Sequence, residues 1–267
     1  MIQFLSLGSG SSGNCYYLKT KQSSILIDAG IPLRDLKKRL SSYGFSIEQV
    51  SAIFVTHDHA DHIKAVGHLA NDMHKPIYAT EKVHIGINNN YCTTSKVTEN
   101  SRRYLYKGES AQVGDFIITP FEVPHDSSDC VGYKIQAEGL TFCLATDVGE
   151  ITPAVAEAIG EANYLVLEAN HDTEMLEQGP YPPYLKNRIR STRGHLSNQQ
   201  CAEALATYAS PNLRQVWLCH LSEENNHPEL ARKTVETILR GYGIITGLDF
   251  AMEVLNRQTP SGVFELN

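Results

Sequence analysis

Short apolar segments alternate with polar, glycine-containing connections along most of the chain, a pattern typical of β-strands interspersed with α-helices. We expect a strand wherever apolar and β-branched residues form a run between turn residues. These predicted strands cover residues 2–7, 15–19, 24–28, 52–55, 77–79, 103–106, 115–121, 131–137, 140–145, 163–168, 215–219 and 249–254. Helical spacing of apolar residues, in several cases after a proline or serine, predicts helices between them. These predicted helices cover residues 32–43, 61–73, 152–160, 197–208 and 228–240, with a short helix from about Thr80.

The order of these elements predicts an α+β fold in which two mixed sheets lie between outer helices. Residues 171–194 are expected to be less regular, because they contain the Gly-Pro-Tyr-Pro-Pro run at 179–183. The glycine-rich stretch 8–14 is compatible with a tight hairpin or with a phosphate-binding loop. The hairpin is favoured, since a strand follows the stretch and the Gly-Lys-Ser/Thr ending of a P-loop is missing. No linker or repeat divides the sequence, so we expect a single domain over residues 1–267.

Composition narrows the class of protein further. A hydrophobic content of 42% is ample for a core, and a formal net charge of −7 argues against a protein that is basic overall, although a local basic patch stays open. The first residues lack a secretory signal, and no apolar run approaches the roughly 18 residues of a membrane span. The six cysteines are scattered without a CxxC pair, which favours free thiols over disulfides. We therefore expect a cytoplasmic protein with no membrane partner.

Candidate chemistry is concentrated in residues 56–62, Thr-His-Asp-His-Ala-Asp-His, directly after the predicted strand 52–55. Histidine and carboxylate are the ligand types of hydrolytic zinc, manganese and iron sites. Alternate side chains of an extended segment point the same way, so His57 and His59 can bind one metal ion. If a helix follows, Asp61 and His62 can reach a second one. The alternatives are a polar strand end without metal and a mononuclear site.

Three more candidate ligands follow predicted strands, where loops present side chains over the edge of a rigid sheet. They are His125, Asp147 and His220. Taken singly, each is equally compatible with a hydrogen-bonded histidine or a helix cap. Taken with the opening motif, the set resembles the metallo-β-lactamase superfamily, whose signature is HxHxDH followed by a distant His, Asp and His. The resemblance extends from residue 2 to about residue 225.

This resemblance implies a four-layer αβ/βα metallo-β-lactamase sandwich of two mixed β-sheets flanked by helices, with a dinuclear site at one edge. It implies two divalent metal ions (zinc, manganese or iron) and a hydroxide between them that attacks the substrate. The implied ligands are His57, His59 and His125 for the first metal, Asp61, His62 and His220 for the second, and Asp147 as the bridge. Asp28, Asp58 and Asp126 are candidates for hydrogen bonds to the ligating imidazoles, with Asp58 more suited to local turn bonding.

The superfamily hydrolyses β-lactams, thioesters and phosphodiesters, so the fold alone does not determine the substrate. Asp147 stands where β-lactamases tend to have a cysteine, which argues against a lactamase. Residues 167–172, 194–197 and 220–226 resemble the ribonuclease Z and phosphodiesterase branch, and with residues 7–14 they resemble the YycJ/WalJ-type group, associated with exonuclease action on DNA. We therefore expect a metal-dependent hydrolase of phosphodiesters, a DNA exonuclease. The alternatives are a thioesterase of glyoxalase II type and a binding module with a structural metal site.

Phosphodiester cleavage also requires a proton for the leaving oxygen, and we expect His195 to supply it with Glu168 as its partner. Asp61 is predicted to belong to the catalytic group as well as to the metal ligands. The basic segment 186–193 precedes His195, and no acidic residue occurs between Glu177 and Glu203. We expect its arginines and His195 to contact the DNA backbone. These predicted substrate-binding residues are Arg188, Arg190, Arg193 and His195. The alternatives are a solvated helix face for the arginines and a neighbour of a helix cap for His195.

Overall fold

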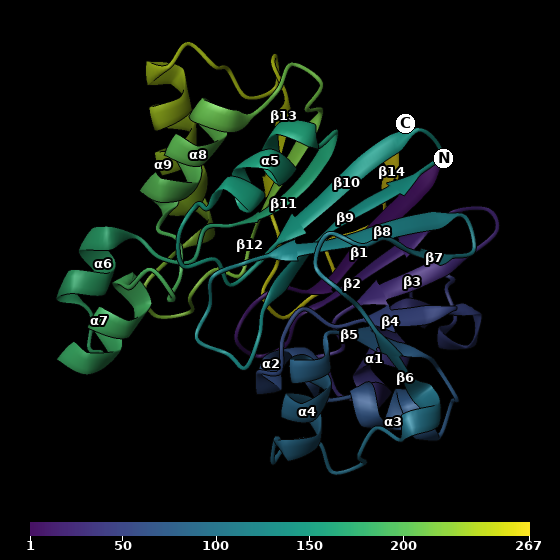
Figure 1. Ribbon diagram of the computed structural model, residues 1–267. Coiled ribbons are helices and arrows are strands. Elements are labelled where there is room, and N and C mark those ends of the chain that lie inside the picture. The colour runs from purple at the N-terminus through teal and green to yellow at the C-terminus, as the bar shows by residue number, and fades with distance from the viewer.

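Two seven-stranded mixed sheets pack face to face in the computed structural model, which describes residues 1–267 (Figure 1). The first sheet has the order β14 (Phe264–Leu266), β1 (Ile2–Gly8), β2 (Cys15–Lys19), β3 (Ser24–Ile27), β4 (Ala52–Phe54), β5 (Ile77–Ala79) and β6 (Arg102–Tyr104). The second has the order β13 (Ala251–Val254), β12 (Gln215–Cys219), β11 (Tyr164–Glu168), β10 (Leu140–Ala145), β9 (Val131–Ala137), β8 (Phe116–Glu122) and β7 (Ala111–Val113).

Helices cover the outer face of each sheet, which makes four layers. The first sheet packs against α1 (Leu33–Ser41), α3 (Val66–Asn71) and α4 (Glu81–Asn89). The second packs against α5 (Pro153–Glu161), α8 (Asn198–Tyr208) and α9 (Pro228–Gly241). The remaining helices lie near one edge of the sandwich: the short α2 (Ala60–Ile63), and the projecting pair α6 (Thr173–Gln178) and α7 (Pro183–Arg190) (Figure 1).

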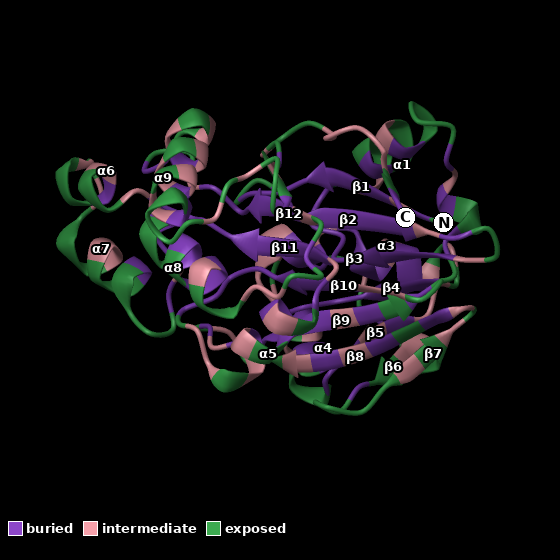
Figure 2. Cartoon of the chain, turned by 90° about the horizontal axis from the view of Figure 1, so that it is seen from above, coloured by how far each residue is buried: buried purple, intermediate pink, exposed green.

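The edge strands β6, β7 and β13 are partly exposed, whereas the central strands of both sheets are buried on both faces (Figure 2). This explains why the central strands are apolar throughout rather than alternating. On β1, Phe4 faces the opposite sheet while Leu5 and Leu7 face the helices. Between the sheets, the Phe4 ring lies 4.7 Å from the Trp217 ring and 5.0 Å from that of Phe142, centroid to centroid. These aromatic contacts across the interface hold the two sheets in a fixed relative position.

The predicted four-layer αβ/βα sandwich is confirmed, and so is the hairpin over residues 8–14, which joins the antiparallel strands β1 and β2. The predicted continuous helix over 61–73 is wrong, because α2 and α3 are separate. The Ala29 amide donates to the His62 carbonyl (2.8 Å) and the Ala65 amide donates to the Ala29 carbonyl (2.8 Å). These bonds to the segment after β3 replace the helical bonds that would join the two helices.

Residues 171–194 are more regular than predicted, since they contain α6 and α7. Asp172 caps α6 by accepting from the amides of Glu174 (3.1 Å) and Met175 (2.9 Å). Pro183 is the first residue of α7, a position where proline starts helices rather than breaking them. The short edge strands β7 and β14 were not predicted. None of the helices combines the length and hydropathy that crossing a bilayer requires.

Candidate metal centre

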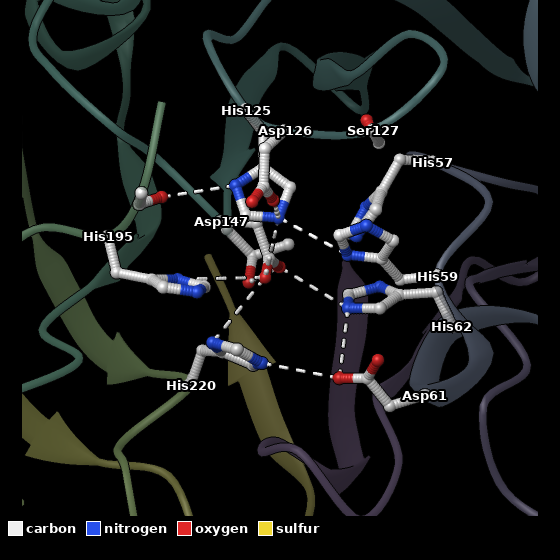
Figure 3. A network of polar contacts seen from close by, with 12 residues as sticks. His57, His59, Asp61, His62, His125, Asp126, Ser127, Asp147, His195 and His220 are labelled. Carbon is white, nitrogen blue, oxygen red and sulfur yellow. Dashed lines mark hydrogen bonds and ion pairs between the residues drawn. The ribbon is translucent and has the colours of Figure 1, made fainter. Parts of the chain in front are cut away.

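The seven predicted metal ligands lie together at one edge of the sandwich, where strands of both sheets end (Figure 3). The first sheet contributes four ligands from the segment between β4 and α2 and from α2 itself. The second contributes three ligands from the segments after β8, β10 and β12. They are His57, His59, Asp61 and His62, and then His125, Asp147 and His220. Because these strands run in the same direction within each sheet, their carboxyl ends meet at one edge, as the strand-end positions predicted.

His57, His59 and His125 form one cluster, with ring nitrogens within 4.8 Å of one another. His125 Nε2 lies 3.3 Å from His59 Nδ1. His57 Nε2 is buried and has no hydrogen-bond partner in the chain, which is costly for a polar atom unless a cation binds it. Burial lowers the pKa of His57 well below its ordinary value and that of His125 to about 4. Both rings are therefore neutral near pH 7, the form that binds metal.

Asp61, His62 and His220 form a second cluster on the other side of Asp147. Asp61 Oδ2 lies 3.4 Å from His220 Nε2 and 3.5 Å from His62 Nε2. Asp147 lies between the clusters, with Oδ2 3.3 Å from His62 Nε2 and Oδ1 3.8 Å from His125 Nε2. Burial opposes ionisation of Asp147, but the surrounding histidines, His220 first, hold its pKa well below the ordinary value. The chain thus has a metal-binding site of imidazoles and carboxylates, with one buried carboxylate facing both clusters.

Asp28 holds His62 of the second cluster in place through the ring nitrogen that faces away from the cluster. Its carboxylate accepts from the Thr56 amide (2.8 Å), from Thr56 Oγ1 (2.9 Å) and from His62 Nδ1 (2.7 Å), all fully buried. Gly30 allows the strand end to approach α2, since a Cβ at this position would stand 1.6 Å from the Asp61 carbonyl oxygen. The predicted hydrogen bond between an aspartate and the imidazole of a candidate ligand is therefore present, with Asp28 as the acceptor. Asp58 instead accepts from the Ser128 amide (3.3 Å).

Three residues of the site have left-handed backbone conformations at the ends of strands. They are Asp28 (φ 59°), Asp147 (φ 57°) and His220 (φ 52°), three of the five non-glycine residues with positive φ. Aspartate and histidine are among the residues that tolerate this conformation. The sharp turn that it produces directs each side chain from its strand end into the space between the sheets' edges.

Glu168 joins the predicted proton donor to the metal ligands. Its Oε1 accepts from His195 Nδ1 (2.9 Å) and from His220 Nδ1 (3.0 Å), and its Oε2 accepts from the amides of Val148 (2.9 Å) and Leu196 (3.0 Å). Burial raises the pKa of Glu168, but the two histidines lower it to about 2, so the carboxylate stays ionised. The other ring nitrogen of His195 has no partner in the chain. His195 lines a hollow of about 180 Å³ together with His220.

The predicted substrate-binding arginines all have partners within the protein. The Arg188 guanidinium pairs with both oxygens of Asp126, and Arg190 pairs with Glu177. Arg193 donates to the His125 carbonyl through Nε (3.1 Å) and Nη2 (2.8 Å). Arg193 therefore supports the loop that carries a candidate ligand, and only Arg188 lines the hollow beside His195.

Sequence reasoning missed the polar residues of the glycine-rich hairpin. Asn14 Nδ2 lies 2.9 Å from His62 Nε2 and 3.2 Å from Asp61 Oδ2. Ser9 Oγ accepts from the His220 amide (3.0 Å). The hairpin thus connects the second cluster to β12. The available signal is the density of serine and asparagine among the glycines of residues 8–14.

Comparison with known proteins identifies relatives over the whole chain. Residues 23–221 match the family model described as "Beta-lactamase superfamily domain". The chain is 35% identical over 260 residues to "Exodeoxyribonuclease WalJ" of Streptococcus pneumoniae serotype 2, covering 97% of this chain and 96% of that protein. It is 32% identical over 262 residues to "Exodeoxyribonuclease YycJ" of Bacillus anthracis, covering 98% of each. Among solved structures, the metallo-beta-lactamase fold protein YhfI from Bacillus subtilis has a similar fold, with a TM-score of 0.72 at 17% identity and 99% coverage of both chains.

Proposed function

This chain belongs to the metallo-β-lactamase superfamily, and on that premise we propose that it is a metal-dependent hydrolase that removes nucleotides from DNA, an exodeoxyribonuclease. The names of the full-length relatives reported above support this substrate. The observation that carries the proposal is the buried Glu168, which holds His195 beside the metal-binding clusters. This arrangement provides a proton donor next to a site for a charged phosphodiester.

We propose that the seven converging residues hold two divalent metal ions. The first cluster and the second cluster each supply three ligands, and Asp147 faces both. Imidazole and carboxylate without thiolate are compatible with zinc, manganese or iron. When bound, such ions neutralise negative charge that develops on the phosphoryl oxygens and lower the pKa of water. Because both sheets supply ligands, we also propose that residues 1–267 function as one domain. Asp61 serves in this scheme as a ligand.

His195 performs the protonation step in our proposal. Hydrolysis adds the hydroxyl of a water to phosphorus and breaks a phosphorus–oxygen bond, so the departing sugar oxygen must gain a proton. The Glu168 carboxylate accepts a hydrogen bond from His195 Nδ1 (2.9 Å) and fixes the orientation of the ring. The remaining nitrogen, Nε2, can then donate its proton to the leaving oxygen. Among the three predicted arginines, we propose that Arg188 contacts a phosphate, since it lines the hollow.

Two substrates with different leaving groups test this assignment. Cleavage of DNA releases a poor leaving group that needs a proton, whereas bis(p-nitrophenyl) phosphate releases p-nitrophenolate, which needs none. We expect His195→Gln to slow DNA cleavage by roughly 10²–10⁴-fold and to change turnover of bis(p-nitrophenyl) phosphate far less. We expect Asp147→Ala to abolish metal-dependent cleavage of both substrates.

If His195→Gln lowers the cleavage rates of the two substrates equally, His195 is not the proton donor. Undiminished activity in Asp147→Ala would overturn the metal mechanism. The assay uses metal-analysed protein with added Mn²⁺ or Zn²⁺ and end-labelled single- and double-stranded DNA. Lactoylglutathione is tested in parallel, and its efficient turnover without DNA cleavage would favour the thioesterase alternative.

A further inference from the structure

A basic hollow lies beside the glycine-rich hairpin, apart from the predicted arginine segment. It has a volume of about 310 Å³ and is lined by three cationic side chains, Arg39, Lys64 and Arg257, and by one carboxylate, Asp35. The chain as a whole carries a formal net charge of −7. The hollow is therefore a local site of opposite charge, formed by residues from α1, from the end of α2 and from the segment after β13.

Backbone carbonyls, and no carboxylates, hold these three cations in place. Lys64 Nζ donates to the Ser12 carbonyl (2.7 Å), and Arg39 Nη1 donates to the Leu7 carbonyl (2.5 Å). Arg257 donates through Nε to one carbonyl (3.0 Å) and through Nη2 to two others (2.7 Å each), in residues 221–226. None of the three forms an ion pair, in contrast to Arg188. Each cation thus has a fixed position, no ion-pair partner and N–H groups left to donate.

The basic hollow continues from the candidate active site across the tip of the hairpin. Ser11 lines the hollow that contains His195 and His220, and the next residue, Ser12, lines the basic hollow. Ser222 also connects them, since it lines the first hollow and its carbonyl accepts from Arg257. The outer side of α1 then continues the basic surface with further exposed cations. They are Arg34, Lys37 and Lys38.

We propose that the basic hollow binds backbone phosphates of the DNA strand next to the phosphodiester that is cleaved. This inference rests on the proposed nuclease function and assigns the path of the substrate. Phosphate oxygens accept strong hydrogen bonds from ammonium and guanidinium groups. Because the carbonyls already fix the cations, little further ordering is needed when a strand binds. A nucleic acid that reaches the metal centre meets these charges as it passes the hairpin tip.

Lys64→Glu, compared with Lys21→Glu, tests the proposal. Lys21 is exposed in the turn between β2 and β3, at the opposite end of β2 from the hairpin, and has no partner in the chain. Both variants change the net charge equally. Binding is measured by fluorescence anisotropy with a non-cleavable phosphorothioate single strand, without metal, over a series of salt concentrations. Turnover of bis(p-nitrophenyl) phosphate is measured in parallel.

We expect Lys64→Glu to weaken DNA binding on the order of tenfold and to lower the slope of log affinity against log salt by about 0.7, the loss of one phosphate contact to a single strand. Lys64→Arg should restore binding. Turnover of the small substrate should match the wild type.

Equal DNA affinity in Lys64→Glu and Lys21→Glu would overturn the proposal. A loss of small-substrate turnover in Lys64→Glu matching its loss of DNA binding would also overturn it, because the residue would then support the active site. If DNA binding by the wild type depends on Lys64 but neither substrate is cleaved, the proposed nuclease function is refuted. The proposal that the basic hollow binds phosphates is then still supported.

Discussion

Asp28 is predicted to control the affinity of the metal centre without binding a metal itself. In Asp28→Asn, one of the two carboxylate oxygens becomes an amide nitrogen, which cannot accept a hydrogen bond. The native carboxylate accepts from His62 Nδ1 (2.7 Å) and from Thr56 (2.8 and 2.9 Å). The variant cannot keep all of these bonds. His62 then loses the contact that fixes its orientation and the tautomer that presents Nε2 to the metal.

The expected size of the effect follows from the chemistry of this bond. Loss of the outer partner of a ligating histidine weakens metal binding by roughly 10–100-fold, about 1.4–2.7 kcal/mol. Asparagine tolerates the left-handed backbone of residue 28 (φ 59°), so the strand end should stay in place. Asp28→Ala should be more severe, because it leaves the buried Thr56 amide and His62 ring without an acceptor. We expect that variant to lose about 3–5 kcal/mol of folding stability.

Competition with a chromophoric chelator measures the metal affinity of the wild type, of Asp28→Asn and of the control Asp35→Asn. Asp35 is exposed at the start of α1 and makes no hydrogen bond through its side chain. Circular dichroism during heating checks that each variant is folded. The reasoning is refuted if Asp28→Asn binds metal within twofold of the wild type.

Three further predictions follow from the same structure. Gly30→Ala places a Cβ 1.6 Å from the Asp61 carbonyl oxygen. We therefore expect the free energy of unfolding, measured with urea, to fall by about 1–3 kcal/mol or more, and metal binding to weaken. An unchanged free energy of unfolding would contradict the packing argument. Arg193→Ala removes two hydrogen bonds to the His125 carbonyl. We therefore expect severalfold weaker metal binding and an unchanged KM for DNA. A raised KM with full metal affinity would show instead that Arg193 contacts the substrate. Burial lowers the pKa of His84, so the folded state disfavours its protonation. The free energy of unfolding therefore decreases as the pH falls below about 6.5, where the ring protonates in the unfolded chain. His84→Gln should flatten the decline of the unfolding free energy between about pH 7 and pH 5.5, and an equally steep decline would contradict this.

The sequence is sufficient to predict the fold class and the convergence of the metal-binding residues. His125, Asp147 and His220 each stand within three residues of the end of a strand, and strands that run in the same direction bring such positions to one edge. Glu168 and His195 are also predictable as partners, because Glu168 is the last residue of β11 and His195 is the histidine of a Gly-His element near the site. The geometry agrees with these pairings, and the chemical roles remain predictions for the experiments above.

Contacts between distant segments account for what the sequence does not reveal. The break between α2 and α3 depends on hydrogen bonds to Ala29, which lies in the segment after β3, more than thirty residues earlier in the chain. The arginines of α7 are a conspicuous charge run, yet Arg188 and Arg190 are paired with acidic residues that no local pattern connects to them. The basic hollow shows the opposite case, since Lys64 and Arg257 are unremarkable in sequence and become a site only in the folded chain.

The left-handed residues Asp28, Asp147 and His220 have a consequence for how such proteins diverge. A residue with a side chain loses on the order of 1 kcal/mol in this conformation compared with glycine. At the three positions together, the left-handed backbone lowers the folding stability by a few kcal/mol relative to glycine. This is the cost of directing the three side chains into the site. A descendant released from selection for catalysis would regain this free energy by accepting glycine there, once the buried polar groups that contact these side chains, such as Thr56 and His62, have also been replaced. Glycine at these positions, in a chain that keeps the hydrophobic pattern, should therefore distinguish relatives that have kept the fold and lost the chemistry.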